Sequence, residues 1–232
     1  MNTLFLTLFR PVRALNQLKT EPFSAMSLVM ILLLMLANLI LLIPVSEKVL
    51  QIIMSSMSLN PAQADMAIEL AYKMRYLQMA GTIILCAVML LFYALILQLV
   101  VRISKRKLEY KKVFQLLVCC YVAVALGDVV NTVLLHVRGI DVIENMYDLS
   151  ITGLSFFTSI EKVGATGYVF LSCFTPFQLW FVALLSIGLS IFAEMKLVKA
   201  IVISVLFWLI TILFPVLSVY FSQATMARSG LM

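Results

Sequence analysis

The residues best suited to chemistry lie within one apolar stretch, Tyr121–His136 (YVAVALGDVVNTVLLH). Asp128 is its only carboxylate, and Asn131, Thr132 and His136 follow it. Each residue of a helix turns about 100°, so Thr132 lies about 40° to one side of Asp128 and Asn131 about 60° to the other. His136 lies at the edge of the same face. This helix is therefore predicted to carry one polar face from Asp128 onward.

A carboxylate inside a segment long enough to cross a bilayer has two interpretations. An aspartate near mid-membrane costs about 3 kcal/mol on insertion scales, so Asp128 is expected to face the protein interior and to have a partner. In the functional interpretation, Asp128, Asn131, Thr132 and His136 form an intramembrane polar site for a ligand, a cation or a proton. In the structural interpretation, Asp128 is neutral or hydrogen-bonded to a neighbouring helix and fixes packing. The sequence leaves both open.

The rest of the sequence offers little catalytic chemistry. Eight residues place Asp128 and His136 about 12 Å apart along a helix, too far for an acid–base pair. We find no Gly-rich phosphate loop, activated-serine elbow or metalloprotease signature in the sequence. The single histidine and the four scattered cysteines show no metal-ligand spacing. We therefore predict a protein that is not an enzyme and that takes no cofactor, metal ion or nucleic acid.

The composition indicates a membrane protein. Hydrophobic residues make up 63% of the 232 residues and charged residues 12%, and a soluble domain of this size cannot bury so much apolar surface. The predicted fold is all-α, a polytopic membrane protein forming a single membrane domain over residues 1–232. Five uncharged or nearly uncharged runs are long enough to be transmembrane helices, at about 23–44, 77–101, 113–136, 176–193 and 200–221.

The connections between these spans have features of their own. In the lead 1–21, apolar residues including Leu8, Val12 and Leu15, with Phe5, share one broad arc, which is typical of a short helix in the membrane interface. A disordered tail is the alternative for this lead.

Two further connections are predicted to carry structure. Asn60-Pro61 is a helix start, and no helix breaker follows before Gly81, so a helix is expected to run unbroken into the second span. Segment 149–175 is apolar but interrupted by Gly, Ser, Glu161 and Lys162. It is expected to lie on the outer face or to dip in as a re-entrant piece covered by protein.

Positive charge predicts the orientation. With five spans, eleven Lys and Arg residues fall on the side of the amino terminus and six on the other. The positive-inside rule then places the amino terminus in the cytoplasm and the carboxyl terminus outside. The densest basic segment, 102–112 (RISKRKLEYKK), is expected to act as an orientation signal and to contact anionic lipid.

Residues 175–210 (TPFQLWFVALLSIGLSIFAEMKLVKAIVISVLFWLI) resemble the last two spans of the Yip family, the Ypt/Rab-interacting membrane proteins. The bacterial branch of that family tends to show an N-P-F-x-x-W start, a Gly in mid-helix and a Lys-Ala pair opening the next helix. The matching positions here are Pro176, Phe177, Trp180, Gly188, Lys199 and Ala200, with Thr175 in place of the Asn. The start FRPVRALNQLKTEP and the Gly167-Tyr168 pair are similar to the family as well.

The resemblance implies a five-span protein of the bacterial cytoplasmic (inner) membrane with the topology given above. It implies a non-enzymatic role in organising membranes or partner proteins, with lipids, a protein partner or a homo-oligomer as the binding partners. The sequence lacks the long amino-terminal region of eukaryotic members, so GTPase binding is not expected. The polar residues around Asp128 support an alternative, a small transporter, channel or lipid-handling protein. In structural terms, Trp180 is expected to anchor a span at the interface and Gly188 to permit a close helix contact.

Overall fold

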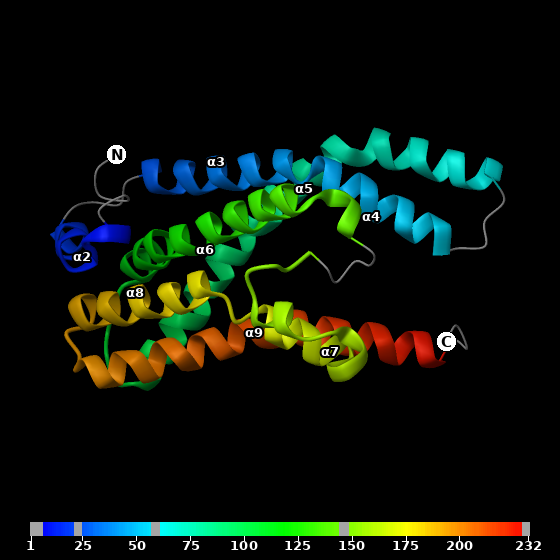
Figure 1. The fold of residues 1–232 in the computed structure, drawn as a ribbon. Coiled ribbons are helices and arrows are strands. Elements are labelled where there is room, and N and C mark those ends of the chain that lie inside the picture. Colours follow the sequence, from blue (N-terminus) through cyan, green and yellow to red (C-terminus); the bar gives the residue numbers. More distant parts are fainter. Residues whose placement is uncertain (1–6, 21–24, 57–60, 144–148, 229–232) are drawn as a thin grey trace.

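The computed structural model describes residues 7–20, 25–56, 61–143 and 149–228, and within these ranges it contains helices and no strand (Figure 1). The protein is therefore all-α. The helices are α2 (Pro11–Thr20), α3 (Ala25–Leu41), α4 (Ile43–Ser56), α5 (Pro61–Ile103), α6 (Tyr110–Arg138), α7 (Ile160–Ser172), α8 (Pro176–Phe192) and α9 (Leu197–Arg228), with 3-10 turns η1 (Ile140–Val142) and η2 (Leu154–Phe157).

Helix α6 is the centre of the bundle. In its most apolar window 67% of the residues are buried inside the protein, against 17% for α5 and 33% for α9. Helices α3, α5 and α8 all pack against it (Figure 1). The apolar residues of α6 therefore form a protein core, whereas much of the apolar surface of α5 and α9 faces outward, as expected of helices that meet lipid.

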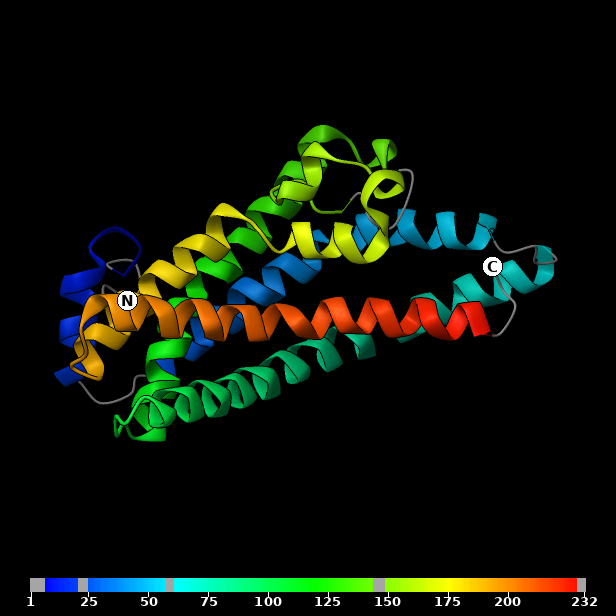
Figure 2. The same cartoon turned by 90° about the horizontal axis from the view of Figure 1, so that it is seen from below.

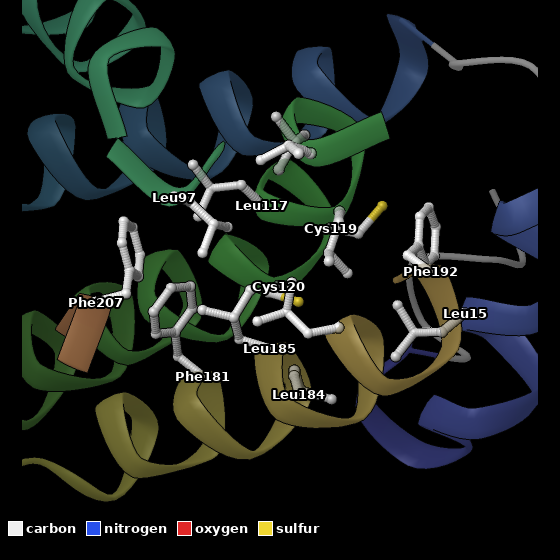
Figure 3. Close-up of a cluster of buried hydrophobic side chains, with 14 of the residues drawn as sticks. Leu15, Leu97, Leu117, Cys119, Cys120, Phe181, Leu184, Leu185, Phe192 and Phe207 are labelled. Atoms are coloured by element: carbon white, nitrogen blue, oxygen red, sulfur yellow. The ribbon is translucent and has the colours of Figure 1, made fainter. Parts of the chain in front are cut away.

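The main core lies where α6, α8, α5 and α9 meet (Figure 3). Leu117 of α6 and Leu184 and Leu185 of α8 are fully buried, and Phe207 of α9 closes the cluster. The thiol groups of Cys119 and Cys120 are buried among these side chains. The labelled residues of this core are Leu15, Leu97, Leu117, Cys119, Cys120, Phe181, Leu184, Leu185, Phe192 and Phe207.

The amino-terminal lead forms a helix, but its apolar face differs from the predicted one. In α2, Leu15 and Leu18 are buried against α8 and α6, whereas Val12 is 55% exposed. Phe5 lies outside the described residues. Leu8 packs on the core as Leu15 does, so among the described residues of the predicted apolar face Val12 is the one that faces away from the protein. The lead is therefore docked onto the bundle by Leu15 and Leu18, because the ends of α6 and α8 offer apolar surface for it.

Three helices are long and apolar enough to cross a membrane unbroken: Ile68–Ile103, Tyr110–Arg138 and Leu197–Gln223. Two bent pairs bring the number of candidate spans to five. Helices α3 and α4 meet at a 48° bend just before Pro44, and α7 and α8 meet at a 40° bend just before Pro176. Proline lacks the N–H that would continue a helix from the preceding turn, so each bend has a local cause in the proline that lies at the start of the second helix of the pair. The protein is polytopic, with three to five spans.

Helix α5 begins at Pro61, the predicted start, and continues to Ile103 over 43 residues. At 1.5 Å per residue it is about 65 Å long, roughly twice the hydrocarbon thickness of a bilayer. Its amino-terminal half runs beside α4, where Arg75 Nη2 donates to Glu47 Oε1 at 2.6 Å (Figures 1 and 2). The predicted second span is thus the carboxyl-terminal part of a much longer helix.

Segment 149–175 contains a helix as well as irregular chain. After η2, helix α7 lies along the carboxyl-terminal half of α9 (Figure 2). Thr166 Oγ1 donates to Gln223 Oε1 at 3.1 Å across this contact. Gly164 adopts φ +70°, a conformation that suits glycine, and it kinks α7.

The residues predicted to share one side of the membrane do lie together. Lys19 pairs with Glu194 at 2.7 Å, and Lys199 Nζ donates to the carbonyl of Ser104 at 2.8 Å, so the lead, the basic loop and the α8–α9 link share one end. The Arg75–Glu47 and Lys48–Asp141 pairs lie at the other end. Charged residues from separate segments thus meet at the same end of the bundle. Which end lies in the cytoplasm stays a prediction.

Candidate functional site

Asp128 lies on α6 and lines a cavity of about 200 Å³. The cavity is bounded by α6, by the segment 150–152 and by the junction between α7 and α8. Asp128 is exposed to this space, and no side chain of the described residues is hydrogen-bonded or ion-paired to its carboxylate. The expectation of a partner is therefore not met in that part of the chain. The lining residues are Val124, Gly127, Asp128, Asn131, Ser150, Thr152, Ser172, Cys173, Thr175, Phe177 and Gln178.

Asn131 borders the same cavity but is fully engaged in holding a loop. Its Nδ2 donates to the carbonyl of Leu149 at 2.8 Å. Its Oδ1 accepts from the backbone N–H groups of Ile151 at 2.9 Å and Thr152 at 3.2 Å, and from Thr152 Oγ1 at 3.2 Å. An asparagine side chain mimics a piece of backbone in this way, so Asn131 fastens segment 149–152 to α6. Its position is structural, and it forms one wall of the cavity.

Thr132 and His136 do not reach the cavity. Thr132 is buried, and its Oγ1 donates to Asn38 Oδ1 of α3 at 2.7 Å. His136 Nδ1 lies 2.8 Å from the carbonyl of Thr132. A carbonyl only accepts, so Nδ1 carries the hydrogen. The predicted four-residue site is thus divided: Asp128 and Asn131 share a cavity, Thr132 joins α6 to α3, and His136 bonds its own helix.

A second cavity of about 170 Å³, called here the aromatic cavity because five of its twelve lining residues are aromatic, adjoins the first. Val124, Cys173 and Gln178 line both. Its other lining residues come from α5, α6, α8 and α9 and are Tyr93, Leu117, Tyr121, Phe181, Phe207, Trp208, Thr211, Ile212 and Pro215. The sequence analysis missed this cavity, although the face of α6 that carries Tyr121 and Val124 one to two turns before Asp128 was a usable signal.

A third hollow, about 970 Å³, lies at the basic loop between α5 and α6. Arg102, Lys105, Arg106 and Lys107 line it together with Tyr110 and three other residues. Four cations around one hollow at the end of the bundle are suited to anionic head groups. The described residues contain no group of three or more His, Cys, Asp or Glu side chains that could hold a metal ion.

The positions that carry the family resemblance have definite contacts at the start of α8. Thr175 is the N-cap, and its Oγ1 accepts from the N–H of Gln178 at 3.1 Å. Threonine can therefore replace the asparagine of the family pattern at this position, since both are good N-cap residues. Pro176 follows as the first helical residue, where its missing N–H costs nothing. Trp180 is 39% exposed at the outside of the bundle.

Two glycines set the distance between α6 and α8. A Cβ built on Gly127 would lie 2.6 Å from Phe177 Cβ, and one built on Gly188 would overlap Leu116 Cδ1. At Gly127 only a residue without a side chain fits, whereas at Gly188 an added methyl would require the end of the Leu116 side chain to move. Small residues are the usual means of close helix approach in membranes. Further along, Lys199 links α9 to the carbonyl of Ser104.

Comparison with protein-family models gives a match to the Yip1 domain over residues 5–219. The chain belongs to the Yip1 domain family. This family consists of non-catalytic membrane proteins, and the apolar helices described above agree with an integral membrane protein of the Yip1 type. No curated protein matches the sequence significantly, and no solved structure does either.

Proposed function

We propose that this Yip1-type protein is non-enzymatic and organises membrane lipids or protein partners around it in a bacterial cytoplasmic membrane. The observation that carries the proposal is the outward surface of α5. Large apolar side chains are exposed along almost its whole length: Met66, Leu70, Tyr76, Leu77, Ile84, Leu85, Val88, Leu91, Phe92, Leu95, Leu99 and Ile103. Extended apolar surface of this kind marks contact with a membrane or with another protein.

Length separates the two kinds of contact. The hydrocarbon core of a bilayer is about 30 Å thick and covers only about 20 residues of a helix. Lipid tails can therefore cover the part of α5 within the predicted span 77–101, whereas Leu70, which is 61% exposed, lies before it. An apolar face that continues beyond the span favours a protein partner, either another chain or a second copy of this one.

The test is crosslinking from two leucines of the same helix. Leu70→Cys and Leu90→Cys are introduced separately into a variant without the four native cysteines, because Leu90 is only 2% exposed and serves as the matched control. In native membranes, Leu70→Cys is expected to give a discrete crosslinked species and Leu90→Cys none. Purified protein in nanodiscs then shows whether the partner is a second copy. Identical, featureless patterns from both variants would contradict the proposal.

A second candidate function is supported by the Asp128 cavity. A carboxylate that has no partner among the described residues and that lines a cavity inside a membrane protein is typical of a substrate or ion pathway. This favours a small transporter, channel or lipid-handling protein. An enzyme is the weakest candidate, because Asp128 and His136 are oriented into different surroundings. Uptake or flux measured in liposomes with the parent protein and with Asp128→Asn tests the second candidate, which predicts activity in the first and its loss in the second.

A further inference from the structure

The charge of the Asp128 cavity is negative and not balanced by its walls. None of the residues that line the cavity is a lysine, arginine or histidine, and Asp128 is the only acid. The start of α8 borders the same cavity through Thr175, Phe177 and Gln178, and it brings no charged side chain to the cavity. The cavity is therefore suited to a cation.

The hydroxyl groups of the walls point to the same kind of ligand. Ser172 Oγ donates its hydrogen to the carbonyl of Val169 at 2.7 Å, and Thr152 Oγ1 donates to Asn131 Oδ1 at 3.2 Å. With their hydrogens used, these oxygens can only accept from a ligand. Asp128 and these two hydroxyl oxygens thus offer lone pairs, which fit an N–H donor or a positive charge.

The adjoining aromatic cavity adds a surface for the remainder of such a ligand. Tyr121 and Phe181 lie with ring centroids 6.4 Å apart, and Phe181 and Phe207 6.5 Å apart. Aromatic faces attract ammonium groups and also accept apolar carbon. An apolar cavity of about 150 Å³ is known to hold benzene, so this one, at about 170 Å³, has room for a ligand of several carbons.

One wall residue has an unused donor. Trp208 is 6% exposed, and its Nε1–H has no hydrogen-bond partner among the described residues. A buried N–H without an acceptor is costly, so a ligand carrying an oxygen at this wall would relieve that cost. This is independent of Asp128, because Trp208 belongs to α9 and lines the aromatic cavity.

We propose that the two cavities form one binding site for a small organic ammonium ion, with the positive group beside Asp128, the carbon part against Tyr121 and Phe181 and, in ligands that carry one, an oxygen at Trp208 Nε1. This proposal names the ligand class for the site of the second candidate function, and it rests on that candidate for the location of the site. It does not require transport, because binding can be measured directly. Ammonium groups of this size occur as free amines and as the head groups of ethanolamine and choline lipids.

The experiment uses Trp208 as its own reporter. The chain has two tryptophans, so Trp180→Phe leaves Trp208 as the only one. This protein is placed in phosphatidylglycerol nanodiscs and titrated with propylammonium, with choline and with the neutral 1-propanol. Both cations are expected to change the Trp208 fluorescence in a saturable way and to raise the melting temperature, and propanol is not.

Variants test the role of the carboxylate. Asp128→Asn should weaken binding of both cations at least tenfold, whereas the matched control Asp141→Asn, which removes an acid outside the cavity, should not. Tyr121→Leu should weaken choline binding more than propylammonium binding, and this variant remains informative if Asp128→Asn does not fold. The proposal is overturned if propanol acts like the cations, if Asp128→Asn binds as tightly as the parent, or if no saturable response occurs.

Nanodiscs of a second composition identify the source of the group. If lipid head groups occupy the site, Trp208 fluorescence in phosphatidylethanolamine nanodiscs is already shifted and added propylammonium changes nothing further. If free amines are the ligands, the titrations in the two lipids agree. Failure of every titration would remove this site and leave the crosslinking test of α5 unaffected.

Discussion

Gly127 of α6 lies directly against Phe177 of α8, so close that a Cβ on the glycine would stand 2.6 Å from Phe177 Cβ. The reciprocal contact, Gly188 of α8 against Leu116 of α6, occurs eleven residues away on each helix. The antiparallel helices α6 and α8 thus make two close contacts about three turns apart. In each contact a side chain of one helix packs directly on a glycine of the other. Because the first point borders the Asp128 cavity, the α6–α8 distance also sets the width of that cavity.

Alanine at these glycines should loosen the bundle. Gly127→Ala is expected to lower the free energy of unfolding by about 1–3 kcal/mol, since the added methyl meets the base of a side chain that cannot rotate away. Gly188→Ala should cost less, because Leu116 meets it with the end of its side chain. Gly81→Ala is the control: nothing lies within 4 Å of its Cβ, so it should be neutral or stabilising. Thermal unfolding in detergent measures all three, and equal effects would refute the contact.

Removing the Asn131 side chain should free segment 149–152 from α6. Asn131→Ala loses one donated and three accepted hydrogen bonds and is expected to destabilise the protein by about 1–3 kcal/mol. Asn131→Asp keeps the acceptor and should cost less. Hydrogen exchange at Ile151 and Thr152 is the measurement, with faster exchange expected in the alanine variant. Unchanged protection there would show that other contacts hold the segment.

Substitution of Asp128 separates structure from function. The carboxylate has no partner among the described residues, so Asp128→Asn and Asp128→Leu should both melt within a few degrees of the parent protein. A binding or transport role predicts that both abolish rescue of the defect caused by deletion of the protein, because neither residue is ionisable. Normal rescue by a stable Asp128→Leu protein would instead make Asp128 dispensable.

The contact between Lys19 and Glu194 should respond to acid. The hydrogen bond from Lys19, together with its positive charge, lowers the pKa of Glu194 below its ordinary value. A lowered pKa in the folded state means that the stabilisation is fully present above the ordinary pKa of Glu194 and is lost as the pH falls through the lowered value. The difference in melting temperature between the parent and Glu194→Gln should therefore shrink between neutral pH and pH about 3. A difference independent of pH would contradict this.

Orientation is tested by labelling intact cells. Glu109→Cys and Asp141→Cys lie at opposite ends of the bundle and each replace an exposed acid, so neither reduces the positive charge of its loop. In a variant without the four native cysteines, an impermeant reagent should label Asp141→Cys and not Glu109→Cys, because the basic loop is predicted to be cytoplasmic. The reverse pattern would invert the predicted topology.

The sequence by itself determined the class of the protein and much of its helical pattern. Apolar runs and prolines are local signals, so Pro61 and Pro176 could be identified as helix starts, and the family resemblance followed from short patterns such as Pro176, Phe177 and Trp180. The long continuous α5 was likewise readable, because nothing interrupts the chain between Pro61 and the second span.

Only the tertiary structure decided what the polar residues of α6 face. Helical periodicity placed Asp128, Asn131 and Thr132 on one side of a helix, but residues 40–60° apart on a helix can meet different neighbours. Here Thr132 is hydrogen-bonded to α3 and Asn131 to segment 149–152, whereas a cavity at the α7–α8 junction lies next to Asp128. That space depends on contacts between residues distant in the chain, above all Gly127 with Phe177. A single sequence carries no signal for such contacts, because any helix-compatible residue at the partner position would give the same local pattern.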